Sequence, residues 1–355
     1  SIVPLVEKLE KNKSIKQILI TSNTLSSSKV LKNNNFKKVI HQFFPIDSNF
    51  LIKKFLNYWS PSKALFIDSE FWPNTILNLK KKKIPIILIN GRITKKTFNR
   101  WNKFSNFSKK IFKNFDLCLS SSKESFNYLK RLNFRNIKLI GNLKYSQAES
   151  ENLYLDKNLN KFLSINNSWC ASSTHESEEL FIGQTHKILK KKIKKLVTII
   201  IPRHIERCFI IKQDLEKLNL KVHLNEPKKK IDPSTDIYLV NSYGKTKSFY
   251  KRCNNVFLGG SLIKHGGQNP LEAARYGCSI VSGPNVQNFK EIYEYLRKNN
   301  ISISVKKNKE LADQLHGLFK KKINPKKIQN KIKTIGDQIL KKTYNEIFVK
   351  TLNEI

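Results

Sequence analysis

The sequence predicts an α/β fold made of two doubly wound, Rossmann-like domains, and three observations lead to this prediction. Short apolar runs alternate with segments whose apolar residues recur every three or four positions, as expected for strand–helix–strand units with a parallel sheet. This alternation stops in a polar stretch at 146–152 and then begins again. A chain of 355 residues, 39% of them hydrophobic, is also long enough to form two separate cores.

The predicted strands form two series, one on each side of the polar stretch. The first series is Gln17–Thr21, Lys38–Phe43, Ala64–Asp68, Pro85–Asn90, Phe115–Ser120 and Ile137–Ile140. The second series is Ser168–Ser172, Leu196–Ile201, Asp236–Val240, Asn255–Leu258 and Ser279–Ser282. Helices are predicted between the strands, and the clearest segments are Ser1–Glu10, Asn49–Trp59, Glu124–Leu132 and Pro325–Leu352.

We therefore expect a first domain at 1–148, a second at 149–325, and a terminal helix at 326–355 that packs toward the first domain. Ligands of open parallel sheets bind beyond the carboxyl ends of the strands. Two such domains facing each other would form a cleft between these edges, and the motifs below all follow predicted strands. The chain has no Met and starts inside a predicted helix, so we expect its natural N-terminus upstream of Ser1.

The net charge of +40 indicates an anionic partner, which is a nucleic acid, an anionic membrane surface or a phosphorylated substrate. Coding bias in an AT-rich genome, which favours Lys and Asn, would produce the same excess. A basic nucleic-acid-binding protein is therefore an alternative from another functional class. The sequence contains no recognisable nucleic-acid-binding module, so we expect no nucleic-acid partner.

The five cysteines are scattered without a CxxC pair, which indicates a reducing compartment and neither a metal site nor a disulfide framework. No apolar run approaches the length of a membrane span. The GxxxxGK[ST], HExxH and GxSxG motifs are also absent. We therefore expect a site that works without a metal or a cofactor.

The segment from Leu258 to Ala274 carries the clearest functional signal. Gly259, Gly260 and Ser261 end a predicted strand, where successive backbone N–H groups can cradle a phosphate. A helix then begins near Asn269, and a helix N-terminus favours negative charge. Glu272, one turn into this helix, is placed to accept hydrogen bonds from a ribose diol. The alternative is a Gly-rich turn before a helix with an acidic start.

Two further motifs follow predicted strands of the second half. Ser173 and Thr174 can donate hydrogen bonds to a phosphate or a sugar hydroxyl, or they can simply cap a helix. Arg203 has the chemistry to bind a phosphate or carboxylate, and His204 can donate to the same group. The alternative for this second motif is a structural salt bridge between Glu206 and an arginine.

The first half contains two candidate motifs. Glu70 follows a predicted strand and would face the cleft, or it belongs to a helix cap beside aromatic side chains. Arg92 precedes a basic amphipathic helix with Trp and Phe on one side. Such a helix can lie on an anionic membrane or pack on the sheet like any other.

Taken together, these motifs resemble a known family. The ordered set is Glu70–Asn74, Asn90–Arg92, Gly141–Lys144, Ser173–Glu176, Pro202–Arg207, Gly259–Ser261 and Asn269–Glu272. It is similar to the 3-deoxy-D-manno-octulosonic acid (Kdo) transferases of lipid A biosynthesis (glycosyltransferase family 30), and the similarity runs from about Ser1 to Phe289. The resemblance implies a GT-B fold with two Rossmann-like domains.

The resemblance also implies an activity and its substrates. The donor would be CMP-Kdo, and the acceptor would be a phosphorylated, acylated lipid A precursor (lipid IVA). Transfer would be inverting and independent of metal. The protein would act at the cytoplasmic face of the inner membrane, either peripherally or through a segment upstream of Ser1. An alternative within the same fold is a transferase or epimerase that uses a UDP-sugar.

Site roles follow from the same resemblance. Glu272 would hold the CMP ribose, while Gly259–Ser261, Ser173, Thr174 and Arg203 would hold the phosphate region. Glu70 and Arg92 match positions near the acceptor and the donor. The family's proposed general base is a Glu in a Gly-Glu pair just upstream of Ser1, and Glu70 is a weaker candidate for that role.

Overall fold

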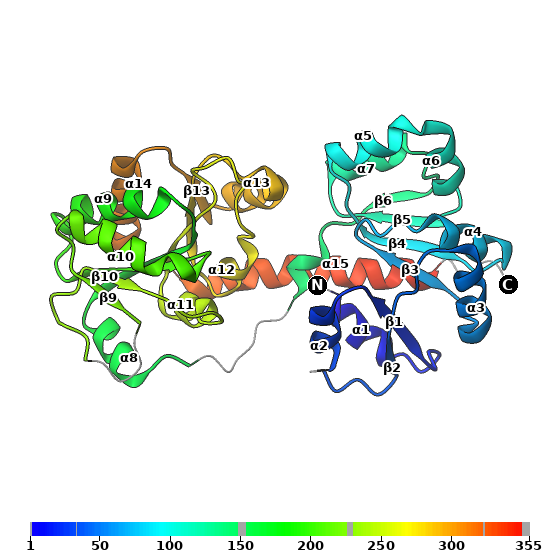
Figure 1. The fold of residues 1–355 in the computed structure, drawn as a ribbon, viewed down its shortest axis with the longest axis horizontal. Coiled ribbons are helices and arrows are strands. Elements are labelled where there is room, and N and C mark those ends of the chain that lie inside the picture. The colour runs from blue at the N-terminus through cyan, green and yellow to red at the C-terminus, as the bar shows by residue number, and fades with distance from the viewer. Residues whose placement is uncertain (1, 33, 148–153, 226–229, 322–323, 350–355) are drawn as a thin grey trace. The chain divides into compact units, whose positions relative to one another are not determined.

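The computed structural model describes residues 2–32, 34–147, 154–225, 230–321 and 324–349, and it is shown in Figure 1. The chain forms two compact units. The first comprises Ser1–Ala148 and Thr334–Ile355, and the second comprises Glu149–Lys333. The predicted domain boundary near residue 148, and the polar residues 148–152 around it, lie outside the described residues.

The first unit contains two parallel sheets, β1-β2 and β3-β4-β5-β6, rather than one continuous sheet. Its strands are β1 (Ile18–Ser22), β2 (Val39–Phe43), β3 (Ala64–Ile67), β4 (Ile86–Gly91), β5 (Leu117–Ser120) and β6 (Ile137–Leu139). Its helices are α1 (Val3–Glu10), α2 (Leu25–Lys32), α3 (Asn49–Trp59), α4 (Pro73–Lys81), α5 (Lys95–Lys103), α6 (Ser105–Phe112) and α7 (Lys123–Arg131), followed by a 3₁₀ turn at Leu143–Ser146. All six strands predicted for this half are confirmed, with ends that differ by one or two residues.

The second unit contains one seven-stranded parallel sheet with the order β13-β12-β11-β7-β8-β10-β9. Its strands are β7 (Asn167–Thr174), β8 (Leu196–Pro202), β9 (Val222–Leu224), β10 (Ile237–Leu239), β11 (Asn255–Leu258), β12 (Ser279–Ser282) and β13 (Ser302–Ser304). Its helices are α8 (Lys157–Ser164), α9 (Glu178–Lys190), α10 (Cys208–Lys217), α11 (Thr246–Arg252), α12 (Leu271–Arg275), α13 (Lys290–Lys298) and α14 (Asn308–Lys320), with 3₁₀ turns at Ile205–Arg207 and Gln287–Phe289. The sequence analysis missed β9 and β13, which are short strands at the two edges of this sheet.

The last helix, α15 (Pro325–Val349), confirms the helix predicted at the C-terminal end, although residues 350–355 are not described. Several side chains of the first unit contact its later turns. The Asn12 amide donates to the Tyr344 hydroxyl at 3.0 Å, and the Lys138 ammonium lies 2.6 Å from the Glu346 carboxylate. Lys63 donates to the Ile347 carbonyl at 2.7 Å. These contacts fix the last turns of α15 on the first unit.

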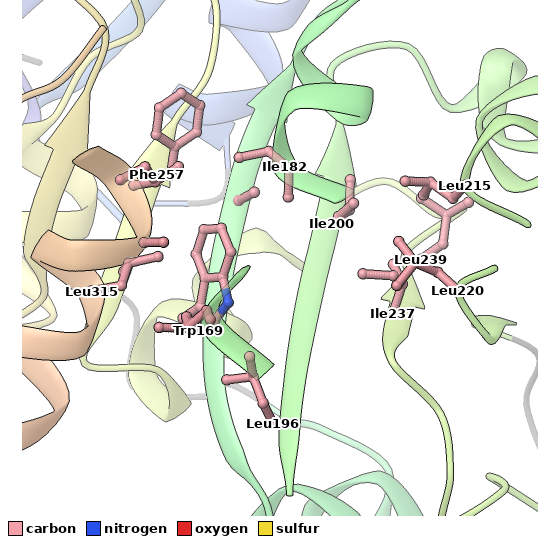
Figure 2. Close-up of a cluster of buried hydrophobic side chains, with 14 of the residues drawn as sticks. Trp169, Ile182, Leu196, Ile200, Leu215, Leu220, Ile237, Leu239, Phe257 and Leu315 are labelled. Carbon is pink, nitrogen blue, oxygen red and sulfur yellow. The ribbon is translucent and has the colours of Figure 1, made fainter. Parts of the chain in front are cut away.

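The second unit has an aliphatic core on one face of its sheet (Figure 2). Trp169 of β7 belongs to a buried cluster with Phe257 of β11 and Leu315 of α14. Because successive side chains of a strand point to opposite faces, Cys170 of β7 lies on the other face. The core therefore holds β7, β8 and β11 in fixed positions, and their carboxyl ends make one edge.

The first unit has a more aromatic core. Phe71, Phe112, Phe115 and Phe134 lie together, and the Phe71 and Phe112 ring centroids are 4.9 Å apart in an edge-to-face arrangement. The basic segment predicted as one amphipathic helix is two helices, α5 and α6, separated at Phe104. The prediction of one helix was wrong, because neither Gly nor Pro marks the break.

Candidate functional site

The edge formed by the carboxyl ends of β7, β8 and β11 is the position where the second sheet can bind a ligand. The chain goes from β7 to β8 on one side and later returns to β11 on the other side of β7. A reversal of strand order of this kind leaves a crevice in which open α/β sheets bind their ligands. Motifs at 173–178, 203–207 and 259–261 follow these three neighbouring strands.

The backbone at the end of β7 departs from regular strand geometry. The pairing of β7 with β8 shifts between Ser172 and Thr174, and Ser173 has a φ of 55°. A non-Gly residue in the left-handed region costs free energy and needs support from its surroundings. Here the Ser173 carbonyl accepts a hydrogen bond from the His175 ring at 3.0 Å. The bulge thus turns the chain directly after β7, where the candidate residues begin.

Glu178 is the central anion of this edge. It is 1% exposed, and its carboxylate accepts hydrogen bonds from four backbone N–H groups. Oε2 accepts from His175 at 3.0 Å and from Gly260 at 2.7 Å. Oε1 accepts from Ser261 at 3.1 Å and from Leu262 at 3.0 Å. Because a carboxylate is held by charge-assisted bonds here, it ties the loop after β7 to the loop after β11.

The loop at Gly260 and Ser261 was correctly predicted to present successive backbone N–H groups. Its interpretation as a phosphate-binding loop does not fit the structure. The successive N–H groups do bind an anion, but that anion is Glu178 of the same chain. The Ser261 hydroxyl is also buried, where it donates to the Leu258 carbonyl at 2.5 Å and accepts from the Gly283 N–H at 2.7 Å. Nothing in the local sequence reveals this, because Glu178 lies far from the loop along the chain.

The two glycines of this loop have different reasons to be glycine. A Cβ on Gly259 would lie 2.4 Å from the Ser173 carbonyl oxygen, so no side chain fits. Gly260 has a φ of 64°, and a Cβ there would lie 3.1 Å from His265 Nδ1 and 3.2 Å from His175 Cε1. Two histidine rings therefore pack over the backbone of Gly260.

The candidate donors around Glu178 differ in exposure. Arg203 and His204 are exposed, and the Arg203 guanidinium makes no hydrogen bond or ion pair with any residue that the structure describes. Its backbone N–H, in contrast, donates to the Thr174 carbonyl at 2.9 Å. Thr174 itself is fully buried. Arg203 and His204 therefore remain able to bind an anion, whereas the Thr174 side chain is enclosed in the protein interior.

The salt bridge that was the alternative for the arginine motif uses a different pair. Arg207 binds Glu179 through two contacts of 3.2 and 3.3 Å, and Glu179 is 3% exposed. Burial raises the pKa of Glu179, and Arg207 partly offsets this. Glu206 accepts instead from the Tyr243 hydroxyl at 2.9 Å. Arg207 is therefore a structural partner of α9, and Arg203 is the arginine left for a ligand.

The helix expected after Asn269 is short. It covers Leu271–Arg275, and Asn269 Oδ1 accepts from the Leu271 N–H at 3.2 Å. Glu272 is half-buried, and its carboxylate lies 3.6 Å from the Lys247 ammonium. The Asn269 side chain thus occupies the helix start that was expected to favour a phosphate, while Glu272 stays at the surface of the unit.

In the first unit, Asp68 and Asn90 join the ends of β3 and β4. The Asn90 amide donates to the Asp68 carboxylate at 2.5 Å and accepts from the Leu143 N–H at 2.9 Å. The Arg92 backbone N–H donates to the Asp68 carbonyl at 3.1 Å, and the Arg92 side chain is half-buried. Glu70 is exposed, and it accepts from the Trp72 indole N–H at 3.0 Å.

Within the described ranges, no group of three or more His, Cys, Asp or Glu side chains could hold a metal ion. The five cysteines are buried and unpaired. None of the helices that the structure describes combines the length and apolar character needed to cross a membrane. In α5, α6 and the junction between them, Phe98 and Phe112 are buried and Trp101 is half-buried, whereas Phe104 is 67% and Phe107 49% exposed.

Comparison with known proteins assigns this arrangement to a family. Residues 1–147 match the model described as 3-deoxy-D-manno-octulosonic-acid transferase (kdotransferase). Over 321 residues the chain is 32% identical to the 3-deoxy-D-manno-octulosonic acid transferase of Rickettsia bellii, which covers 89% of this chain and 75% of that protein. The enzyme of the same name from Haemophilus influenzae is 27% identical over 341 residues, which cover 95% of this chain and 79% of that protein.

A solved structure described as a UDP-N-acetylglucosamine 2-epimerase matches with a TM-score of 0.66. It covers 99% of this chain and 93% of that chain, at 10% sequence identity. At this identity the likeness shows a shared fold and nothing about the substrate. It confirms the prediction of two Rossmann-like domains of the GT-B kind.

Proposed function

The chain belongs to the 3-deoxy-D-manno-octulosonic acid transferase family, glycosyltransferases of lipopolysaccharide biosynthesis, and we propose that it transfers Kdo from CMP-Kdo to the lipid A precursor lipid IVA. The observation that carries the donor half of this proposal is the exposed Arg203 guanidinium beyond the end of β8. It lies at the strand-order reversal of the second sheet, beside residues 173–175. A planar cation that makes no side-chain hydrogen bond or ion pair with the described residues suits the phosphate of a nucleotide-linked sugar.

The proposed chemistry is a direct displacement with inversion. A hydroxyl of the acceptor attacks the anomeric carbon of Kdo, the bond from this carbon to the phosphate oxygen breaks, and CMP leaves with the electron pair. Negative charge grows on the leaving phosphate, and Arg203 with His204 would neutralise it without a metal. Glu272 would hold the ribose, near the start of α12. The N–H groups of Gly260 and Ser261 have no part in this proposal, because Glu178 uses them.

The acceptor side of the proposal depends on the first unit. A carboxylate must remove the proton of the attacking hydroxyl. Among the residues of this chain we propose Glu70, whose exposed carboxylate follows β3, as a candidate for this role. Arg92 would then face the substrates from the end of β4.

Replacing Arg203 tests the donor half. Arg203→Ala should lower kcat/KM for Kdo transfer about a hundredfold or more, because one charge-stabilising donor is typically worth this much. Arg203→Lys should recover only part of the activity, since Lys keeps the charge without the planar pair of donors. Arg297→Ala, which removes an exposed arginine of α13, is the matched control. Near-normal transfer by Arg203→Ala, or equal competition by UDP-sugars and CMP, would contradict the proposal.

We also propose that α5 and α6 lie on the anionic cytoplasmic face of the inner membrane. The exposed Phe104 and Phe107 support this, together with the surrounding exposed basic side chains Lys95, Lys96, Lys103, Lys109, Lys110 and Lys113. Replacing both phenylalanines with Ser should reduce binding to vesicles that contain anionic lipid. It should leave CMP binding unchanged, because the nucleotide contacts proposed above belong to the second unit.

A further inference from the structure

Three histidines meet at the carboxyl edge of the second sheet, each from the end of a different strand. His175 follows β7, His204 follows β8, and His265 lies in the loop after β11. The ring centroids of His175 and His265 are 4.4 Å apart, and those of His175 and His204 are 6.2 Å apart. No sequence motif singles out His265, because only the fold brings it to this edge.

The contacts of His175 determine where it can take up a proton. Its Nδ1 lies 3.0 Å from the Ser173 carbonyl oxygen, which can only accept a hydrogen bond. Nδ1 therefore carries a hydrogen, and in the neutral ring Nε2 is unprotonated. An added proton must go to Nε2. The protonated ring could then donate from Nε2 to an anion while Nδ1 keeps its bond to the backbone.

The surroundings of His175 disfavour its protonated form in the absence of a ligand. Burial lowers the pKa of His175, and the adjacent His265 lowers it further. Glu178, whose carboxylate lies 3.8 Å from Nδ1, acts in the opposite direction, and the more distant His204 lowers the pKa weakly. A second anion placed among these rings would favour the protonated form, because it offsets both the burial and the repulsion between the histidines.

We propose that His175, His204 and His265 form a binding site for an anionic group of the donor, and that binding at this site is linked to protonation. The enzyme would then take up a proton when the donor binds. This inference rests on the proposed function and deepens it. CMP-Kdo carries two anionic groups on one carbon, the phosphate of CMP and the carboxylate of the octulosonic acid. Arg203 provides a fixed cation at this edge, and the histidines supply a further charge only when an anion is present.

The affinity for CMP should therefore depend on pH through His175. One linked proton weakens binding about tenfold per pH unit between the pKa of the free ring and the higher pKa of the ring in the complex. The second ionisation of a phosphate monoester is near pH 6, so between pH 7 and 8.5 the slope belongs to the protein. Calorimetric titration of the full chain in two buffers of different ionisation enthalpy should show uptake of about one proton in this range.

Two variants separate this linkage from a structural role. His175→Asn places an amide N–H near the position of Nδ1 and removes Nε2, so it keeps the bond to Ser173 and loses the proton. It should reduce the change in CMP affinity between pH 7 and 8 from about tenfold to less than twofold. His265→Gln changes an exposed ring and should shift the range of the linkage. His316→Gln, on α14, is the matched control and should behave as the wild type.

Three ligands identify the anion. Cytidine lacks both anionic groups and should bind without proton uptake. CMP tests the phosphate, and Kdo alone tests the carboxylate. Proton uptake on binding either ligand supports the proposed anion-binding site if this uptake disappears in His175→Asn. Uptake of no proton with CMP, with Kdo and with the intact donor would overturn it, as would uptake that persists in both variants. Failure of the wild type to bind CMP or to transfer Kdo would instead contradict the proposed function.

Discussion

The two units hold the carboxyl ends of their strands in different ways. In the second unit, one buried carboxylate, that of Glu178, accepts four backbone N–H groups from two loops. In the first unit, two carboxylates on different loops share this role. Asp68 accepts from the Asn90 side chain at the ends of β3 and β4, and Asp47 accepts from Asn74 and Thr75 at the start of α4.

The difference in burial follows from this division. Glu178 is 1% exposed and Glu179 beside it 3% exposed, so the edge of the second unit has a closed polar interior. Asp68 is only half-buried, and nearby Glu70 is exposed. Both edges nevertheless use residues with a left-handed backbone, which are Asp68 and Asn90 in one unit and Ser173 in the other. Such strain persists only where surrounding contacts over-determine it.

This contrast indicates that the second edge is preorganised, while the first can adjust more. A rigid edge would suit the small charged nucleotide donor that we propose for the second unit. A less constrained edge would suit the acylated acceptor that we propose for the first unit. The predictions below test the contrast through stability, beginning with the largest effect.

Glu178→Ala should cause the largest loss. It leaves four buried N–H groups without their acceptor, and each orphaned donor typically costs about 1–3 kcal/mol. We expect a loss of about 4 kcal/mol, after allowing for water that enters the space. Hydrogen exchange of the full chain should show much faster exchange in residues 258–262.

Two further variants test whether this loss of stability comes from the missing hydrogen-bond acceptor. Glu178→Gln retains one carboxamide oxygen and should lose about half as much stability, while Glu176→Gln changes an exposed neighbour and should have little effect. Equal exchange in the wild type and in Glu178→Ala would show that the carboxylate does not hold the loop, and the contrast between the units would disappear.

Asp236→Asn tests whether a buried carboxylate at the amino-terminal ends of the strands of the second sheet contributes as much to the free energy of unfolding as Glu178 does at the carboxyl ends. Asp236 is 4% exposed, and its carboxylate contacts Lys190 and the His186 ring. Burial alone would raise the pKa of Asp236, but the hydrogen bonds from His186 and Lys190 outweigh it and hold the pKa below its usual range. We expect a loss of about 2 kcal/mol at pH 7, measured by urea denaturation of the full chain.

The sign of this effect sets its pH dependence. Because the folded-state pKa of Asp236 is depressed, its stabilising contribution is complete above the unfolded value near 4 and is lost as the pH falls further. The gap between wild type and Asp236→Asn should thus be constant from pH 7 to about 5 and shrink below about 4. Asp214→Asn, which removes a half-buried carboxylate 3.0 Å from the exposed Lys217 ammonium, should show almost no gap at any pH.

Asn90→Ala addresses the first unit. It removes the bond to Asp68 and the acceptor of the Leu143 N–H, so we expect a loss of about 1.5 kcal/mol. Faster exchange should be confined to the ends of β3 and β4 and to residue 143. A loss as large as that of Glu178→Ala would mean that the two edges are equally rigid.

The sequence predicted the strands well because parallel strands buried on both faces are continuous apolar runs. β11 and β12 have the predicted bounds, and so does α3. Local patterns also located every loop of the candidate site. Arg203 and Glu272 keep side chains at the surface, which is compatible with the roles expected for them.

The contacts made by these loops could not be predicted, because they join residues far apart in the chain. Glu178 was read as an acidic helix start, yet it binds the loop at 260–262. Arg207 likewise pairs with Glu179 rather than with Glu206. A Gly-rich loop looks the same whether its N–H groups receive a ligand or a carboxylate of the chain itself.

Of these variants, Asp47→Asn should cause the smallest loss of stability, and it serves as the reference for the first unit. Asp47 accepts from the Asn74 N–H through Oδ2 and from the Thr75 N–H and hydroxyl through Oδ1, each at 2.7–2.9 Å. Asn retains one acceptor oxygen and loses the negative charge at the start of α4, so we expect a loss of about 1 kcal/mol. Exchange should accelerate only in the first turn of α4, and Asn57→Ala on α3 should leave it unchanged. If Asp47→Asn instead destabilised the whole first unit, this edge would depend on a single carboxylate as the second edge does, and the inferred difference in rigidity would be wrong.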